Sequence, residues 1–305
     1  APSPRRRRLT RAAIRMSFSL YVEVLIQGVL SGLVYGLMAL GLSVIFGVVR
    51  VVNFAHGEFA VLAMYCAFVL FGLAGVDPII ASIPLAIAFF VLGYAMQRGM
   101  VQPFVTRPQH EQFILLVGVA LVITNGLLLV FGPESKHVDL PYSFDSYTVA
   151  GVLIDKVRVY GAAAALAVTA ALFAFFRFTS TGTAIRASAD NLTGAAVVGL
   201  DVKRLYAISF GLGLACVGAA GSIMMALTDM TPMLAPSLTL LAFTIVIVGG
   251  LGSMTGALAG GLLIGVAEAV ASLVVSPAIK SMVSFGLLVL VLALRPQGLF
   301  GKAES

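Results

Sequence analysis

The stretch SFSLYVEVLIQGVLSGLVYGLMALGLSVIFGVV, residues 17–49, is 33 residues long and contains one charged side chain, Glu23. A helix needs about 20 mainly apolar residues to span a bilayer, whereas the apolar part of a signal peptide covers about 7–15 residues. The stretch therefore predicts a retained first membrane span rather than a cleaved leader.

Seven further apolar runs follow, covering residues 59–76, 78–97, 112–132, 159–176, 205–228, 237–267 and 281–294. Only 10% of the 305 residues are charged, 60% are hydrophobic, and the mean hydropathy is +1.07. A soluble domain has about 25% charged residues, so this chain has too few charges to cover itself in water. We expect an all-α fold: a polytopic transmembrane helical bundle with eight to ten crossings and broken or re-entrant segments.

The basic residues, which give a net charge of +6, lie between the apolar runs and therefore predict topology rather than nucleic-acid binding. On this basis residues 1–16 form a cytoplasmic basic extension, and residues 17–305 form a single transmembrane domain. Loop 133–158 is expected outside the cell, with a small hairpin, and loop 177–204 inside. Both termini are predicted to be cytoplasmic, which requires an even number of crossings between Arg15 and Arg98.

Glycines recur at short spacing in the first and the seventh run. Small residues three or four positions apart allow helix backbones to approach closely, and they also permit a break that lines a cavity. The two cysteines, Cys66 and Cys216, lie inside apolar runs without a partner for a metal or redox site. We expect them to be packing residues, and no metal site is predicted.

The segment RVVNFAHGEF, residues 50–59, places Asn53, His56 and Glu58 between two apolar stretches. Polar groups at membrane depth usually face a bundle interior or water, and a helix break can direct them at a solute. The alternative is an interfacial loop whose polar groups contact lipid headgroups. The spacing of His56 and Glu58 does not match a zinc site.

Glu268 lies in LIGVAEAVASLVV, inside a long apolar stretch. A carboxyl group there should be hydrogen-bonded, protonated or directed at a cavity, and it should not face lipid. A structural link between helices is as compatible with the sequence as contact with a solute.

The loop RFTSTGTAIRASADNLTGAAVVGLDVKR, residues 177–204, is the longest polar stretch predicted inside the cell. Residues 184–198 predict one short amphipathic helix that ends at Gly199. It is either an ordinary interfacial helix or a docking element for a cytoplasmic partner. Candidate docking residues are Arg186, Asp190, Leu192, Val197, Val198, Gly199 and Leu200.

Sequence motifs of catalysis are missing from the chain. We find no GxxxxGK[ST] phosphate loop, no HExxH and no GxSxG. The sequence therefore predicts a protein that is not an enzyme and that binds no cofactor of its own.

Four segments together resemble the H-type permease subunit of branched-chain amino-acid ABC importers: NFAHGEF, RASADNLTGAAVVGLDVKRL, GGLGSMTGALAGGLLIGVAEA and LALRPQGLFG. The resemblance covers about Met16 to Gly301. It implies a bacterial inner-membrane permease that pairs with a second, homologous permease, two cytoplasmic ATPases that hold ATP and Mg, and an extracytoplasmic solute-binding protein. By this resemblance Arg186–Gly199 is the coupling helix that docks on an ATPase. Similar permeases carry urea, amides or aromatic acids.

Two other functional classes are weaker. A carrier driven by an ion gradient would need coupling carboxylates within the membrane, for which only Glu58 and Glu268 are available. It would also leave the long cytoplasmic loop unexplained. A membrane enzyme would need a cluster of acid–base or metal-binding residues, and none is visible in the sequence.

Overall fold

The computed structural model describes residues 4–149, 151–273 and 280–301. Within these ranges eight helices are long and apolar enough to cross a membrane, and a shorter apolar helix covers Met282–Leu294. The predicted polytopic helical bundle is therefore confirmed. The α-helices and β-strands are α1 (Pro4–Val49), α2 (His56–Ala74), α3 (Pro78–Met96), α4 (Gln109–Phe131), β1 (Ser146–Val149), β2 (Val152–Asp155), α5 (Lys156–Phe178), α6 (Ser180–Asp190), α7 (Leu192–Val197), α8 (Val202–Leu227), α9 (Ala235–Gly249), α10 (Met254–Ala271) and α11 (Lys280–Leu294).

Helix α1 is the centre of the bundle and packs along both α10 and α8. Its glycines make this packing close. A Cβ atom added to Gly32 would lie 2.8 Å from the carbonyl oxygen of Gly261 on α10, and one added to Gly41 would collide with the Gly213 carbonyl on α8. The close-packing interpretation of these glycines therefore holds at both positions.

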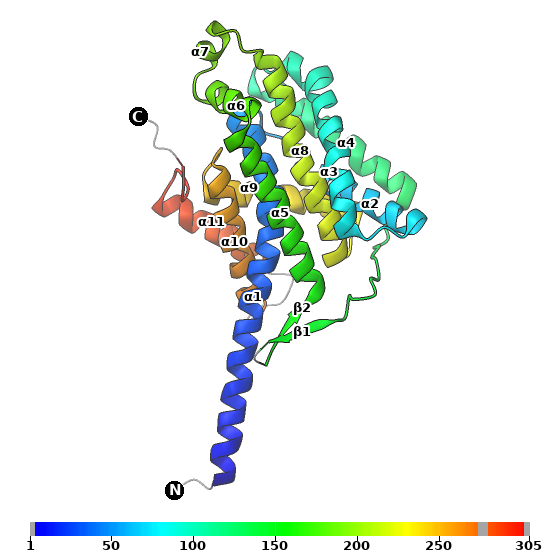
Figure 1. Cartoon of the computed structure of the whole chain (residues 1–305), viewed down its shortest axis with the longest axis vertical. Coiled ribbons are helices and arrows are strands. Elements are labelled where there is room, and N and C mark those ends of the chain that lie inside the picture. Colours follow the sequence, from blue (N-terminus) through cyan, green and yellow to red (C-terminus); the bar gives the residue numbers. More distant parts are fainter. Residues whose placement is uncertain (1–3, 150, 274–279, 302–305) are drawn as a thin grey trace.

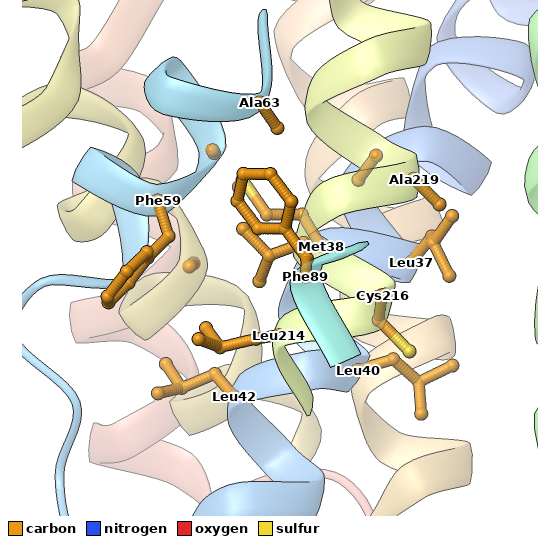
Figure 2. Packing of buried hydrophobic residues seen from close by; sticks show 14 of the residues in the cluster. Leu37, Met38, Leu40, Leu42, Phe59, Ala63, Phe89, Leu214, Cys216 and Ala219 are labelled. Carbon is orange, nitrogen blue, oxygen red and sulfur yellow. The ribbon is translucent and has the colours of Figure 1, made fainter. Parts of the chain in front are cut away.

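A dense apolar core surrounds the middle of α1 (Figure 2). Leu37 and Met38 of α1 pack there with Phe59 of α2, Phe89 of α3 and Leu214 of α8, all at most 3% exposed. The three consecutive helices α1, α2 and α3 are thereby fixed around one cluster with α8, which is distant in sequence.

Helices α3 and α4 lie at the edge of the bundle and expose their apolar side chains. Ile83 and Ile87 on α3 are 64% and 63% exposed, and Val122 and Leu129 on α4 are 73% and 87% exposed. Such side chains suit a lipid environment, which explains why the chain has so few charges.

The bundle has two ends: in Figure 1 the β1–β2 hairpin marks the lower end, and α6 and α7 mark the upper end. At the hairpin end, strand β2 packs against α1, and Arg158 at the start of α5 donates to the Ser31 hydroxyl at 2.9 Å. At the opposite end, which we call the α6–α7 end, Gly47 of α1 lies beside Gly252. Helix α1 therefore runs from the hairpin end to the α6–α7 end.

The two ends of the described chain lie at opposite ends of the bundle. Pro4 begins α1 beyond the hairpin (Figure 1). The backbone N–H groups of Leu299 and Phe300 instead donate to the carbonyls of Val248 and Gly249 at the α6–α7 end of α9. This placement differs from the prediction that both termini lie on the cytoplasmic side of the membrane. The basic residues near the N-terminus had suggested a shared side, but α1, α2 and α3 make three passes rather than an even number.

The segment between α4 and α5 closes the hairpin end. Strands β1 and β2 pair in antiparallel fashion, with Tyr147 opposite Ile154, which confirms the predicted small hairpin. Tyr142 donates a hydrogen bond to the Asp77 carboxylate at the start of α3. Burial, and then this hydrogen bond, raise the pKa of the Tyr142 phenol, so it remains a donor at neutral pH.

Candidate functional site

Residues 50–55 form a re-entrant segment that returns into the bundle after α1 ends. Arg50 adopts a left-handed backbone with φ 57°, which turns the chain back on itself. The His56 ring nitrogen Nε2 then lies 2.9 Å from the Met38 carbonyl oxygen. Met38 precedes the last residue of α1 by 11 positions, or about 16 Å of helix. The segment therefore reaches well below the end of α1.

Asn53 and His56 are both 0% exposed, which favours a site inside the bundle over an interfacial loop. The Asn53 side-chain oxygen accepts from the Ala55 N–H at 3.1 Å and so shapes the turn that begins α2. His56 donates to a carbonyl through Nε2, so its Nδ1 is an acceptor. Asn53 Nδ2 and His56 Nδ1 have no hydrogen-bond partner within the described part of the chain.

Thr239 on α9 joins the start of α2 to the opposite helix. Its hydroxyl accepts from the Gly57 N–H at 2.9 Å and donates to the Glu58 carboxylate at 3.0 Å. A Cβ atom at Gly57 would collide with the Ala235 carbonyl and with the Thr239 backbone nitrogen. Only glycine allows α2 to lie this close to α9, which explains why a glycine stands between His56 and Glu58. The sequence interpretation missed Thr239, whose only signal is a hydroxyl within an apolar run.

Glu268 occupies a separate site between α9, α10 and α11. Glu268 is 7% exposed, and its carboxylate accepts a hydrogen bond from the Ser284 hydroxyl at 2.8 Å. It faces a cavity of about 170 Å³ that is lined by Ser237, Leu238, Leu240, Leu241, Thr244, Glu268, Ser284 and Phe285. The buried position and polar neighbour agree with the expectation that this carboxyl avoids lipid. Ser284 was not anticipated from the sequence.

The structure does not bring Glu58 and Glu268 together. Glu58 contacts Thr239 on one face of α9, whereas Glu268 shares its cavity with Leu241 and Thr244. Because successive helix residues turn by about 100°, Leu241 points away from Thr239. Helix α9 therefore separates two acidic sites.

The predicted amphipathic helix over 184–199 is two helices in the structure. Asn191 has an extended backbone with φ −146° and ends α6 after Asp190. Its side chain then accepts from the Gly194 N–H at 2.8 Å and caps the start of α7. The prediction of one continuous helix was wrong because it overlooked that this asparagine ends one helix and caps the start of the next.

Gly199 ends α7 as predicted. Its φ is +83°, and the N–H groups of Gly199 and Leu200 donate to the carbonyls of Ala196 and Ala195. These two bonds form a Schellman motif, in which a left-handed glycine satisfies the last carbonyls of a helix.

Helix α7 projects from the α6–α7 end (Figure 1). Leu192, Val197 and Val198 are 47%, 81% and 75% exposed, so three of the four apolar anchors proposed from sequence form an uncovered surface. Leu200 instead packs against the core of its own chain. On α6, Arg186 is exposed and donates to Thr183 at 3.4 Å, and Asp190 is also exposed.

Comparison with known proteins adds to this geometry. The family described as "Branched-chain amino acid transport system / permease component" matches residues 24–292. The chain is 30% identical to the high-affinity branched-chain amino acid transport system permease protein LivH of Salmonella typhimurium, over 94% of this chain and 97% of the relative.

Two further relatives are similar along most of their length. The high-affinity branched-chain amino acid transport system permease protein BraD of Pseudomonas aeruginosa is 29% identical over 93% of this chain and 97% of its own. A probable branched-chain amino acid transport permease protein LivH of Methanocaldococcus jannaschii is 25% identical over 87% of this chain and 88% of its own. No solved structure matches the chain.

Proposed function

This chain belongs to the family of permease components of branched-chain amino-acid transport systems, and from that membership we propose that it forms the translocation path of an ATP-driven ABC importer for branched-chain amino acids. The match over residues 24–292 is the observation that supports this proposal most strongly. In the proposed importer a second homologous permease completes the path, two ATPases hydrolyse ATP, and a binding protein delivers the solute.

The exposed surface of α7 supports an ATPase docked at the α6–α7 end. Leu192, Val197 and Val198 present apolar area beside a rigid glycine stop, and buried apolar anchors supply most of the energy of an interface. This end then faces the cytoplasm. The basic residues of its helix ends and loops agree with that orientation: Arg50, Arg98, Arg107, Arg177, Arg186, Lys203, Arg204 and Arg295.

We assign Asn53, His56 and Glu58 to the substrate path. Asn53 Nδ2 and His56 Nδ1 offer a donor and an acceptor that no described residue uses. The re-entrant backbone reaches into the bundle at their positions, as broken segments do where they line a solute path.

ATP-dependent uptake in proteoliposomes tests the function. We expect the permease, reconstituted with its partner permease, ATPases and binding protein, to accumulate radiolabelled leucine only when ATP is enclosed with the ATPases. Urea, acetamide and phenylalanine serve as competitors, because similar permeases carry such solutes.

Uptake without the ATPases, driven by an ion gradient, would contradict the proposal and favour a secondary carrier. Uptake of urea or an amide in place of leucine would retain the ABC mechanism but reject the substrate.

A further inference from the structure

The Glu268 cavity carries several polar groups in a mainly apolar wall. Besides the carboxylate, its wall includes the hydroxyl residues Ser237, Thr244 and Ser284. The Thr244 hydroxyl donates to the Leu240 carbonyl of its own helix, and Ser284 donates to Glu268. Because both hydroxyl hydrogens are already donated, the oxygens of Thr244 and Ser284 act toward a guest as acceptors.

The cavity is large enough for a guest and opens at the surface of the described chain. Its volume of about 170 Å³ is more than ten times the ~10–15 Å³ that a single water requires. Leu240 and Phe285 line it and are 50% and 41% exposed. A carboxylate open to lipid costs about 2.5 kcal/mol or more, so a polar guest, or water, is a better occupant than acyl chains.

We propose that this cavity binds the ammonium group of the transported amino acid, with the Glu268 carboxylate as its counter-ion. The inference rests on the proposed transport of branched-chain amino acids. A primary ammonium group has three N–H donors, and the carboxylate with the hydroxyls of Ser237 and Ser284 provides three acceptor groups. Leu238 and Leu241 in the same wall suit the aliphatic part of such a solute.

The same ammonium chemistry occurs in the headgroup of phosphatidylethanolamine. Nanodiscs made only of phosphatidylglycerol contain no lipid amine, so they separate the two sources. The experiment uses the permease purified with its partner subunits and places a reporter cysteine at Leu240, with Cys66 and Cys216 replaced by alanine.

The first measurement compares how fast positively charged aminoethyl and negatively charged sulfonatoethyl methanethiosulfonate label Leu240→Cys. A carboxylate nearby favours the cation, so Glu268→Gln should lower the ratio of the two rates by about tenfold. The matched control is Glu134→Gln, which removes an acid that is 82% exposed at the hairpin end and should leave the ratio unchanged. An unchanged ratio in Glu268→Gln would overturn the proposal.

The second measurement asks which molecules protect the cysteine in phosphatidylglycerol nanodiscs. L-leucine and 3-methylbutylamine should slow labelling, whereas 4-methylpentanoate, which lacks the ammonium group, should not. Ser284→Ala leaves the carboxylate in place and should raise the leucine concentration needed for protection by about 2–10-fold, the usual effect of one hydrogen bond. This variant tests the site even where Glu268→Gln fails to fold.

Protection by phosphatidylethanolamine alone, or by none of these molecules, would overturn the assignment to the transported solute. Labelling does not depend on transport, so the experiment tests the Glu268 site independently of the proposed transport function. Leucine uptake without leucine protection rejects only the Glu268 site. Protection without uptake rejects only the proposed transport function.

Discussion

Single residues hold the re-entrant segment in place, and Thr239 is the clearest case. Its hydroxyl serves both the Gly57 N–H and the Glu58 carboxylate. We expect Thr239→Val, which keeps the shape but removes the hydroxyl, to destabilise the permease by about 1–2 kcal/mol, because two buried polar groups lose their partner. Leucine uptake should fall with it. Thermal unfolding in nanodiscs and initial uptake rates measure the two effects.

Thr239→Ser is the control, since it retains the hydroxyl and loses one methyl group, at a cost of about 0.8 kcal/mol. Equal stability and uptake of the valine and serine variants would show that the hydroxyl does not hold the segment.

At this scale the sequence predicts Asn53, His56, Glu58 and Glu268 as candidates for the substrate path, because polar side chains within apolar runs stand out. It did not identify Thr239 or Ser284. A hydroxyl in an apolar helix commonly bonds its own backbone, as Thr244 does here, so sequence alone does not reveal which hydroxyl reaches across to another helix.

Among the elements, the short helix α7 exposes the apolar side chains of Leu192 and Val197, and its role in coupling can be tested. We expect Leu192→Asp to weaken ATPase binding by about tenfold or more, because a charge replaces an anchor at the interface. Gly199→Val should also impair coupling, since a β-branched residue at φ +83° costs about 1–3 kcal/mol. Co-purification with the ATPase and solute-stimulated ATP hydrolysis are the measurements.

The matched control is Leu153→Asp on strand β2, at the hairpin end. Leu153 is 50% exposed and Leu192 is 47% exposed, so the two substitutions place the same charge at similar exposure. If Leu192→Asp and Gly199→Val both assembled and transported normally, α7 would be an interfacial helix without a coupling role.

Element boundaries show where sequence reasoning succeeds. Gly199 was predicted as a stop and is one, because a left-handed helix end strongly favours glycine. The break at Asn191 was missed, although asparagine is a preferred N-cap. Alanines occur on both sides of it at 187, 189, 195 and 196 and favour a continuous helix, and propensity does not show that the second helix turns away from the first.

At the scale of the whole molecule, the described chain has its two ends at opposite ends of the bundle, which gives a topology test. We expect a tag fused ahead of Pro4 and a cysteine replacing Phe144, which is 95% exposed, to react from outside intact cells. A cysteine replacing Ala196 on α7 should react only after permeabilisation. Membrane-impermeant labelling in a variant without Cys66 and Cys216 gives the measurement.

A tag that shares the side of Ala196 rather than Phe144 would contradict the path of α1. The sequence prediction differs from this arrangement because it gives the basic residues at 5–15 the same weight as those of the loops. The re-entrant segment also makes the number of membrane crossings hard to count from the sequence. Residues 50–55 reverse the direction of the chain although they are shorter than a normal loop.

The first helix, fixed by its glycines, also has a consequence for the surrounding lipid. Its apolar span Ser19–Val49 has 31 residues and α10 has 18, which correspond to about 46 Å and 27 Å. A long helix usually meets a thin bilayer by tilting, but contacts such as Gly32 with Gly261 prevent α1 from tilting independently of α10. The bilayer must therefore adapt to the difference between the length of α1 and its own hydrocarbon thickness. It either thickens around the exposed side chains of Leu20 and Leu25 or leaves them in the headgroup region.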